Sequence, residues 1–146
     1  IFHKREWIDQ DINKVWSFFS NPQNLKDLTP KFLGLRLVDP NLDKMKSNME
    51  LTYKLSIWGI RLKWKAKIIA YEKDSHFQDL QIQGPFAYWC HTHKFEKLAD
   101  GCLITDKIRF KLPLAPLSAL FLPIFEWQIR QLFKYRTKKL AKILSI

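Results

Sequence analysis

The spacing of apolar residues changes along the chain and predicts its elements. Loose alternation over 1–7 predicts a first strand. After Asp11, a good helix N-cap, apolar residues recur at helical spacing up to Ser20 and predict a helix. Asn21-Pro22 ends this helix, and Pro22 opens a second short one that ends near Thr29-Pro30.

The middle of the chain has a period of two, which is typical of strands. The expected strands are a short one over 33–38 and five longer ones at Met49–Trp58, Ile60–Tyr71, His76–Gln83, Tyr88–Leu98 and Cys102–Leu112. After Pro113 the period returns to 3.6 and predicts a helix from about Pro123 to Ser145. At 1.5 Å per residue this helix is about 34 Å long, enough to cross a sheet. Because no repeat or linker interrupts it, we expect 1–146 to form a single α+β domain.

Tight turns determine which side chains share a face of the expected sheet. A turn at Trp58-Gly59 pairs Tyr53 with Trp64 and Leu55 with Leu62, so bulky apolar residues fall on one side. A turn at Asp100-Gly101, the strongest hairpin signal, pairs Phe95 with Asp106 and His93 with Ile108. One face is therefore expected to hold Trp89, His91, His93, Phe95, Asp106, Ile108 and Phe110. An odd-length loop through Gly84-Pro85-Phe86 adds Phe77, Asp79 and Gln81 to that face.

Composition and charge narrow the class of protein. Of 146 residues, 25 are Lys or Arg and 14 are Asp or Glu, so the formal net charge is +11. An aromatic content of 14% excludes a disordered basic tail. The stretch from Leu112 to Phe125 is apolar but holds three prolines, so we do not expect a membrane span.

The cations form two stripes on the outer face of the predicted sheet, and the last helix adds more. They are Arg61, Lys63, Lys65 and Lys67, then Lys107, Arg109 and Lys111, then Arg130, Lys134, Arg136, Lys138, Lys139 and Lys142. A solvated face is the leading interpretation, and an anionic membrane surface is the next. Nucleic acid is disfavoured, because no stacking aromatics interleave the cations and no nucleic-acid module motif is present.

The two cysteines give information about the cellular compartment of the protein and about metal binding. Cys90 and Cys102 fall on neighbouring predicted strands at positions that do not pair, so we expect no disulfide. Free thiols favour a reducing cytoplasm. Neither cysteine has the spacing of a zinc site.

Several motifs carry a resemblance to a known family. The most specific reads Phe77-x-Asp79-x-Gln81-x-x-Gly84-Pro85-Phe86-x-x-Trp89-x-His91-x-His93-x-Phe95. The others are Val15-Trp16-x-Phe18-Phe19, Asn24-Leu25-x-x-Leu28-Thr29-Pro30, Trp64, Asp106 and Phe133-x-Tyr135-Arg136. Over essentially its whole length the chain resembles the START/polyketide-cyclase (SRPBCC) superfamily, and more narrowly its bacterial branch often labelled cell-division-inhibitor-like. The resemblance implies a helix-grip fold, in which a curved antiparallel sheet wraps around the last helix and encloses a hydrophobic ligand cavity. It implies no reaction, because this scaffold hosts carriers, receptors and cyclases.

These expectations define a candidate ligand site and a function. The expected lining residues are Tyr53, Leu55, Leu62, Trp64, Asp79, Gln81, Trp89, His91, His93, Phe95, Asp106, Ile108 and Phe110. The expected partner is a hydrophobic small molecule or lipid, bound and carried without a cofactor. An enzyme of the cyclase/dehydratase type is the alternative, and a basic docking module for anionic membranes or nucleic acid is the third hypothesis.

The histidines and aspartates of the site allow four interpretations. Structural pairing leads, because a buried ionisable group costs several kcal/mol unless it has a partner. Ligand orientation comes second and acid–base catalysis third. A metal site comes last, and we expect no metal. No nucleophile motif or phosphate loop accompanies the cluster, so the sequence leans away from catalysis without excluding it.

The segment Leu112–Pro123 is unusually apolar for a connection. Pro116 and Pro123 prevent a regular helix throughout it. The favoured expectation is a loop packed onto the body of the domain. The alternative is a mouth of the cavity that touches a membrane through Leu120, Phe121 and Leu122.

Overall fold

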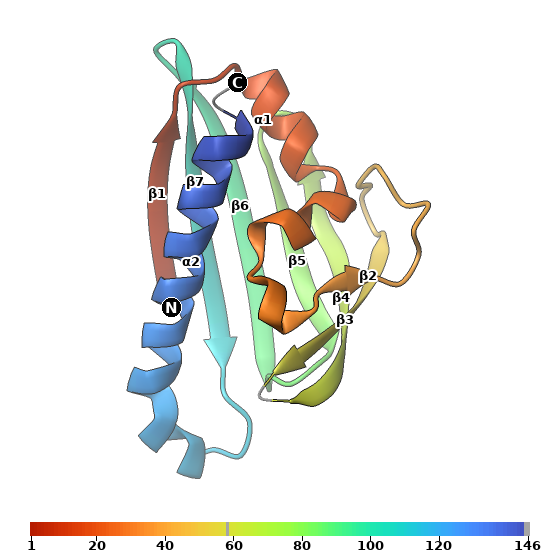
Figure 1. Ribbon diagram of the computed structural model, residues 1–146, viewed down its shortest axis with the longest axis vertical. Helices are drawn as coiled ribbons and strands as arrows, with labels where there is room; N and C mark the ends of the chain where they lie inside the picture. The colour runs from red at the N-terminus through yellow and green to blue at the C-terminus, as the bar shows by residue number, and fades with distance from the viewer. Residues whose placement is uncertain (58, 145–146) are drawn as a thin grey trace.

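The computed structural model describes residues 1–57 and 59–144, which form one antiparallel sheet with helices over its inner face (Figure 1). The strands are β1 (Phe2–Ile8), β2 (Arg36–Leu37), β3 (Glu50–Ile57), β4 (Ile60–Glu72), β5 (His76–Gln83), β6 (Tyr88–Leu98) and β7 (Gly101–Lys111). Their order is β1-β7-β6-β5-β4-β3-β2, so the first strand pairs with the last.

Two α-helices and three 3₁₀ helices complete the described part of the fold. They are α1 (Ile12–Phe19), α2 (Leu122–Leu144), η1 (Pro22–Leu28), η2 (Lys31–Leu33) and η3 (Leu117–Phe121). In Figure 1, α2 runs along the inner face of the sheet, with α1 and η1 beside it. The predicted α+β helix-grip fold is confirmed.

Side-chain caps place the first two helices where the sequence predicts them. The Asp11 carboxylate accepts a hydrogen bond from the backbone N–H of Asn13 at 2.8 Å. The Asn21 side chain accepts one from Gln23 at 3.0 Å, and Pro22 occupies the first helical position. The expected strand over 33–38 shrinks to Arg36–Leu37, because η2 continues to Leu33.

The strand registers confirm one hairpin and correct another. Tyr53 pairs with Trp64 and Leu55 with Leu62 as predicted, while Trp58 of the turn lies outside the described residues. The register predicted from Asp100-Gly101 is wrong by two residues. Leu98 pairs with Gly101, His93 with Asp106 and Phe95 with Ile104. A slip of two residues keeps every side chain on its predicted face, because strand side chains alternate with a period of two.

Contact with β1, rather than turn geometry, explains the glycine at position 101. A Cβ at Gly101 would lie 2.4 Å from the carbonyl oxygen of Ile8 and 2.5 Å from the Trp7 ring. The turn instead consists of Ala99 and Asp100, and Ala99 adopts a φ of 55°. The glycine signal therefore marked a close approach of two strands.

The remaining hairpin brings the motif residues together, and irregularities curve the sheet. Phe77 pairs with His93 and Asp79 with His91, so these residues share a face as predicted. Between β4 and β5 the register shifts at Lys65/Ala66 and again at Ile68/Ala70. Such bulges bend and twist a strand, which helps the sheet to wrap around α2.

Two apolar clusters fill the space between sheet and helices. The larger lies beneath α1 and includes Trp16, Phe19, Phe77 and Phe95. The smaller joins Ile108 of β7 to Ile129 and Phe133 of α2. Cys90 and Cys102 are free thiols, and both are buried. Within the described residues no helix is long and apolar enough to cross a membrane.

Candidate functional site

A cavity of about 280 Å³ lies between the inner face of the sheet and the helices. Its sheet wall is formed mainly by Leu51, Tyr53, Leu55, Trp64, Ala66, Ile68, Phe77, Trp89 and Ile108. Its helical wall includes Phe18, Phe19, Leu25, Leu28, Ile129, Leu132 and Phe133. Apolar walls with a few polar groups are typical of small-molecule sites.

The structure brings eight of the thirteen expected residues to this cavity. They are Tyr53, Leu55, Trp64, Asp79, Trp89, His91, His93 and Ile108. Hairpin register was sufficient to group them, because all lie on inward-facing positions of neighbouring strands.

The other five expected residues lie elsewhere. Phe95 packs in the core against Trp16 and Phe19, and Phe110 packs against Phe125 of α2. The Gln81 side chain bonds the backbone of Phe86 through both its amide atoms, at 2.8 and 3.3 Å, and so holds the following turn. Leu62 faces a groove at the edge of the sheet, and Asp106 lies buried against His91.

Sequence reasoning missed the helical wall and one charged residue in it. Arg136 of α2 lines the cavity although it is only 8% exposed. It follows Ile129 by seven residues and Phe133 by three, so all three share a helix face. An arginine on an otherwise apolar helix face was the signal that could have found it.

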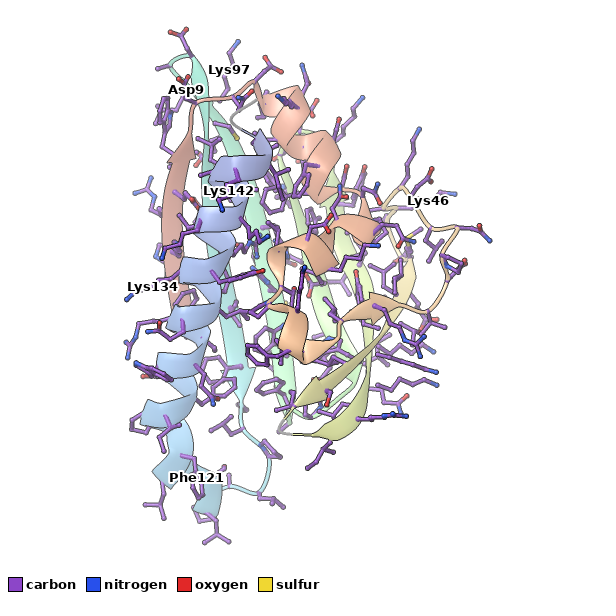
Figure 2. The ribbon with its side chains drawn as sticks, viewed as in Figure 1. Asp9, Lys46, Lys97, Phe121, Lys134 and Lys142 are labelled. Carbon is purple, nitrogen blue, oxygen red and sulfur yellow. The ribbon has the colours of Figure 1, made fainter. Side chains whose placement is uncertain are left out.

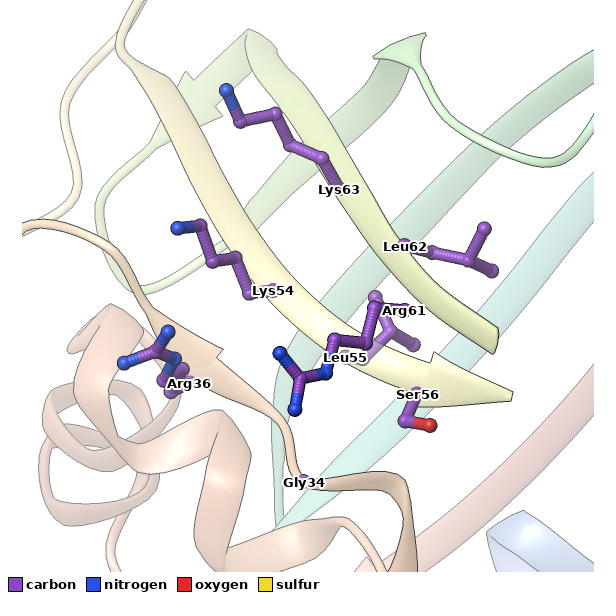
Figure 3. A pocket seen from close by; sticks show the side chains of 8 residues that line it. All are labelled: Gly34, Arg36, Lys54, Leu55, Ser56, Arg61, Leu62 and Lys63. Atoms are coloured by element: carbon purple, nitrogen blue, oxygen red, sulfur yellow. The ribbon is translucent and has the colours of Figure 1, made fainter. Parts of the chain in front are cut away.

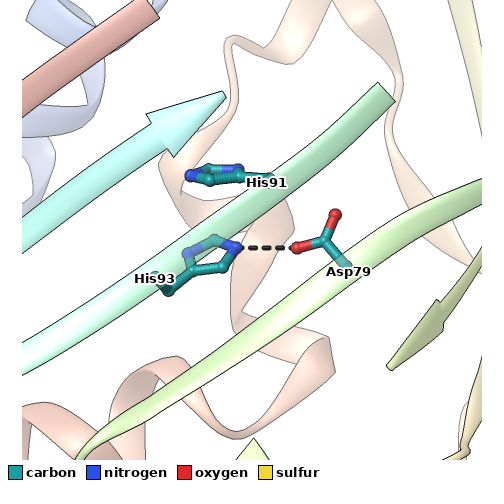
Figure 4. Close-up of side chains that lie close together, drawn as sticks. All are labelled: Asp79, His91 and His93. Carbon is teal, nitrogen blue, oxygen red and sulfur yellow. Dashed lines mark hydrogen bonds and ion pairs between the residues drawn. The ribbon is translucent and has the colours of Figure 1, made fainter. Parts of the chain in front are cut away.

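Asp79, His91 and His93 form the polar wall of the cavity (Figure 4), and Asp106, outside the lining, pairs with His91. His93 Nε2 lies 2.7 Å from Asp79 Oδ2, the contact drawn as a dashed line. His91 Nε2 lies 2.7 Å from Asp106 Oδ1, and the two imidazole rings stack with centroids 3.6 Å apart. Arg136 Nη2 lies 3.7 Å from the same Asp106 oxygen. We call Asp79, His91, His93, Asp106 and Arg136 the polar cluster.

Burial and pairing set the charge of the polar cluster. Burial, and then the neighbouring His91, lower the pKa of His93 to about 4 against the opposing effect of Asp79 and Asp106. Burial raises the pKa of Asp106, but Arg136 and His91 together lower it below its ordinary value. Burial likewise raises the pKa of Asp79, and the hydrogen bond and charge of His93 reverse this shift. Near neutral pH, His93 is therefore neutral and donates a hydrogen bond from Nε2 to an ionised Asp79.

Tyr53 contributes a neutral hydroxyl to the same cavity. Burial, and then the charge of Asp79, raise the pKa of Tyr53 above its ordinary value. Its hydroxyl donates to the backbone carbonyl of Pro22 at 3.4 Å and so connects the sheet to η1.

Asp79, His91 and His93 are the described residues with the spacing to hold a metal ion, because their ligand atoms lie within 4.8 Å of one another. Both Nε2 atoms are already engaged by carboxylates, and Arg136 adds a positive charge beside Asp106. A cation would have to displace these pairs. The arrangement therefore fits a hydrogen-bonded cluster better than a metal centre.

A second, shallower groove lies at the edge of the sheet (Figure 3). It has a volume of about 530 Å³ and is lined by Arg36, Lys54, Arg61 and Lys63 beside Leu55 and Leu62. Lys54 pairs directly with both Arg36 and Lys63 across neighbouring strands. The cationic lining of the groove makes it a poor site for an apolar ligand.

Comparison with known proteins agrees with this architecture. The profile of the family described as polyketide cyclase / dehydrase and lipid transport matches residues 8–134. The chain belongs to this family. The match confirms the SRPBCC resemblance, while the cell-division-inhibitor-like branch stays a prediction. No curated protein is similar enough to the chain to count as a relative.

Solved structures of other members of this fold are similar along almost their whole length. A protein from Thermus thermophilus has a TM-score of 0.75 at 12% identity, with 96% of this chain and 93% of that chain covered. A Chromobacterium violaceum protein has a TM-score of 0.73 at 10% identity, with 99% and 96% covered. The ginseng major latex-like protein 151 from Panax ginseng has a TM-score of 0.67 at 15% identity, with 98% and 95% covered. At such identities the likeness concerns the fold alone.

Proposed function

We propose that this family member binds, and carries, a hydrophobic small molecule or a lipid in the cavity between the sheet and α2. The observation that carries the proposal is the cavity itself, whose apolar walls meet one polar cluster. Membership of a family described by cyclase, dehydrase and lipid transport functions supports the ligand class.

The size and charge of the site narrow the ligand further. At about 280 Å³ the cavity lies near the lower end of ligand pockets, which span roughly 300–1,000 Å³. This favours a compact ring system or a single acyl chain over a phospholipid with two chains. The two ionised aspartates outnumber Arg136, so the polar cluster favours a hydroxyl or carbonyl group of the ligand over a carboxylate.

Native mass spectrometry of the purified protein tests this function. We expect a protein population with added mass that organic extraction removes, and an extracted molecule that rebinds to the apo protein. Rebinding should compete with a neutral fluorescent probe such as N-phenyl-1-naphthylamine. A protein that carries no extractable molecule and binds neither the probe nor any extract would contradict the proposal.

An enzyme of the cyclase/dehydratase type is the second candidate function. The observation that favours it is the neutral His93 beside an ionised Asp79 on the cavity wall, an arrangement that suits acid–base chemistry. Incubation of the extracted ligand with fresh protein distinguishes the two functions. A changed product that His93→Gln no longer forms favours the enzyme, whereas an unchanged ligand favours the carrier.

The setting of this function is also a proposal. Residues 1–146 would act as one ligand-binding domain, and buried free thiols at Cys90 and Cys102 suit a reducing compartment such as the cytoplasm. An anionic membrane surface is the proposed second partner, because the chain carries a net charge of +11.

A further inference from the structure

One end of the molecule exposes an unusual number of large apolar side chains. These are Leu114, Leu117, Leu120, Phe121, Ile124 and Trp127, with exposed fractions between 54% and 81%. We call them the apolar tip. η3 and the first turns of α2 project beyond the ends of the strands in Figure 1, and Figure 2 labels Phe121 at this end. The favoured expectation of a loop packed onto the body of the domain is therefore wrong.

With distance from this end, the exposed side chains change from aliphatic and phenylalanine to tryptophan and then to cations. Phe121 ends η3 near this end of the molecule, and Trp127 lies about 7.5 Å beyond Leu122 along the axis of α2, at 1.5 Å per residue. The exposed cations Arg130 and Lys134 come within the next two turns. Lys111, also exposed, ends β7 just before the tip. Glu126 is the single acidic residue in the sequence between Lys107 and Lys134.

This order matches the layers of a bilayer interface. Leucine and phenylalanine side chains favour the acyl region, tryptophan is enriched at the boundary, and cations are attracted to anionic headgroups. Two copies joined tip to tip would instead bring the same cations of both copies together, because such an interface is symmetric. Charge complementarity therefore favours an anionic membrane over a second copy.

We propose that the apolar tip inserts into the surface of an anionic membrane, with α2 steeply inclined to it and Lys111, Arg130 and Lys134 among the headgroups. Ile129 and Leu132, which line the cavity, lie within two turns of the tip on α2. Insertion therefore brings one end of the cavity close to the bilayer. The proposal does not depend on the identity of the ligand.

Co-sedimentation with vesicles tests the proposal directly. The vesicles are phosphatidylcholine alone or phosphatidylcholine with about 30% phosphatidylserine, at low and at high salt. We expect binding to the anionic vesicles that weakens at high salt. Phe121→Ser should lower the partition coefficient at least tenfold, because it removes a buried aromatic ring from the acyl region. Phe32→Ser is the matched control, since Phe32 is 82% exposed on η2 and lies outside the tip.

A second pair of variants tests the contribution of the cations to membrane binding. Arg130→Gln should weaken binding several-fold at low salt, whereas Lys97→Gln at the opposite end of the molecule should not (Figure 2). Quenching of the protein fluorescence by lipids brominated near the headgroup should fall in Trp127→Phe.

Three results would overturn the proposal. They are no sedimentation with anionic vesicles at low salt, an equal loss in Phe32→Ser and Phe121→Ser, and self-association that Phe121→Ser abolishes without any vesicle binding. The last result would assign the tip to a second copy. Probe binding in the cavity of Phe121→Ser should be unchanged, so failure of membrane docking remains distinguishable from failure of the ligand-binding function.

Discussion

The polar cluster and the apolar tip both depart from the usual placement of side chains, because the cluster buries polar groups and the tip exposes apolar ones. The cluster buries one aspartate, two histidines and an arginine among apolar residues and half-buries a second aspartate, and its His–Asp pairs meet at 2.7 Å. The tip leaves six large apolar side chains more than half exposed. Each charged group of the cluster has a partner of opposite charge or a hydrogen-bond partner beside it, so the cluster stabilises the fold. The exposed side chains of the apolar tip contribute little to the stability of the fold, so they indicate a binding partner.

The largest effect should come from breaking the cluster at its centre. Asp106 faces His91 at 2.7 Å and Arg136 at 3.7 Å, and it pairs across the strands with His93. Asp106→Ala leaves the buried guanidinium without its carboxylate, which should destabilise the protein by about 3–5 kcal/mol. Urea unfolding measures the change. Asp100→Ala, at an exposed turn position, is the control and should change the stability by less than about 0.5 kcal/mol. Equal effects in both variants would show that the cluster does not stabilise the fold.

Acid should lower the stability of the protein through the same cluster, and by a similar amount. The pKa of His93 is about 4 in the folded protein against an ordinary 6.5. Below pH 6.5 the unfolded chain takes up a proton that the folded protein refuses, so stability is complete above pH 6.5 and falls towards pH 4. The loss over this window is about 3 kcal/mol. The pKa values of Asp79 and Asp106 are lowered in the folded protein. Below about pH 4, protonation of these two carboxylates therefore lowers the stability further.

Urea midpoints at several pH values between 7.5 and 4.5 measure this loss. His93→Gln should flatten the profile, while His3→Gln, at an exposed position on β1, should leave its slope unchanged. A slope in His93→Gln equal to that of the unmodified protein would assign the acid sensitivity to another group.

A smaller effect should separate ligand binding from folding. Trp64 lines the cavity and packs edge to face with Trp89 at a centroid distance of 5.2 Å. Trp64→Ala should weaken binding of N-phenyl-1-naphthylamine about tenfold while the protein remains folded, because the probe loses an apolar wall. Fluorescence titration measures the affinity, and Trp7→Ala on β1 is the matched control. Unchanged affinity in a folded Trp64→Ala variant would place the ligand elsewhere.

The smallest effect on stability is expected at the tip. Phe121→Ser replaces a ring that is 62% exposed, so the free energy of unfolding should change by less than about 0.5 kcal/mol. The same variant is expected to lose membrane binding, which would sharpen the contrast with Asp106→Ala. A loss of more than about 2 kcal/mol would show that the tip packs against the fold in solution.

Much of the fold could be predicted from periodicity and turn residues. Six strands, the cap at Asp11 and the last helix lie within one or two residues of their expected bounds. The wrong turn at Asp100-Gly101 did not disturb the predicted face, because a shift of two residues preserves strand alternation. Inward and outward positions are local properties of a strand, so the sequence was sufficient to identify them.

The cavity lining was predicted less completely, because it depends on the elements that cover the sheet. Phe95 and Phe110 face inward as expected, but α1 covers one and Phe125 of α2 packs on the other. Gln81 turns towards the loop, and Arg136 reaches the cavity from α2. No pattern within a single strand records where a helix crosses it.

The sequence by itself determined the element order, the two faces of the sheet and the clustering of His and Asp residues on its inner face, because these follow from spacing along the chain. Tertiary structure alone decided that His93 bonds Asp79 while His91 bonds Asp106, and that Arg136 joins them. It also decided that Leu120 and Phe121 stay outside. Both outcomes depend on how segments far apart in the sequence come together in space, and residue spacing within one strand or helix does not specify that arrangement.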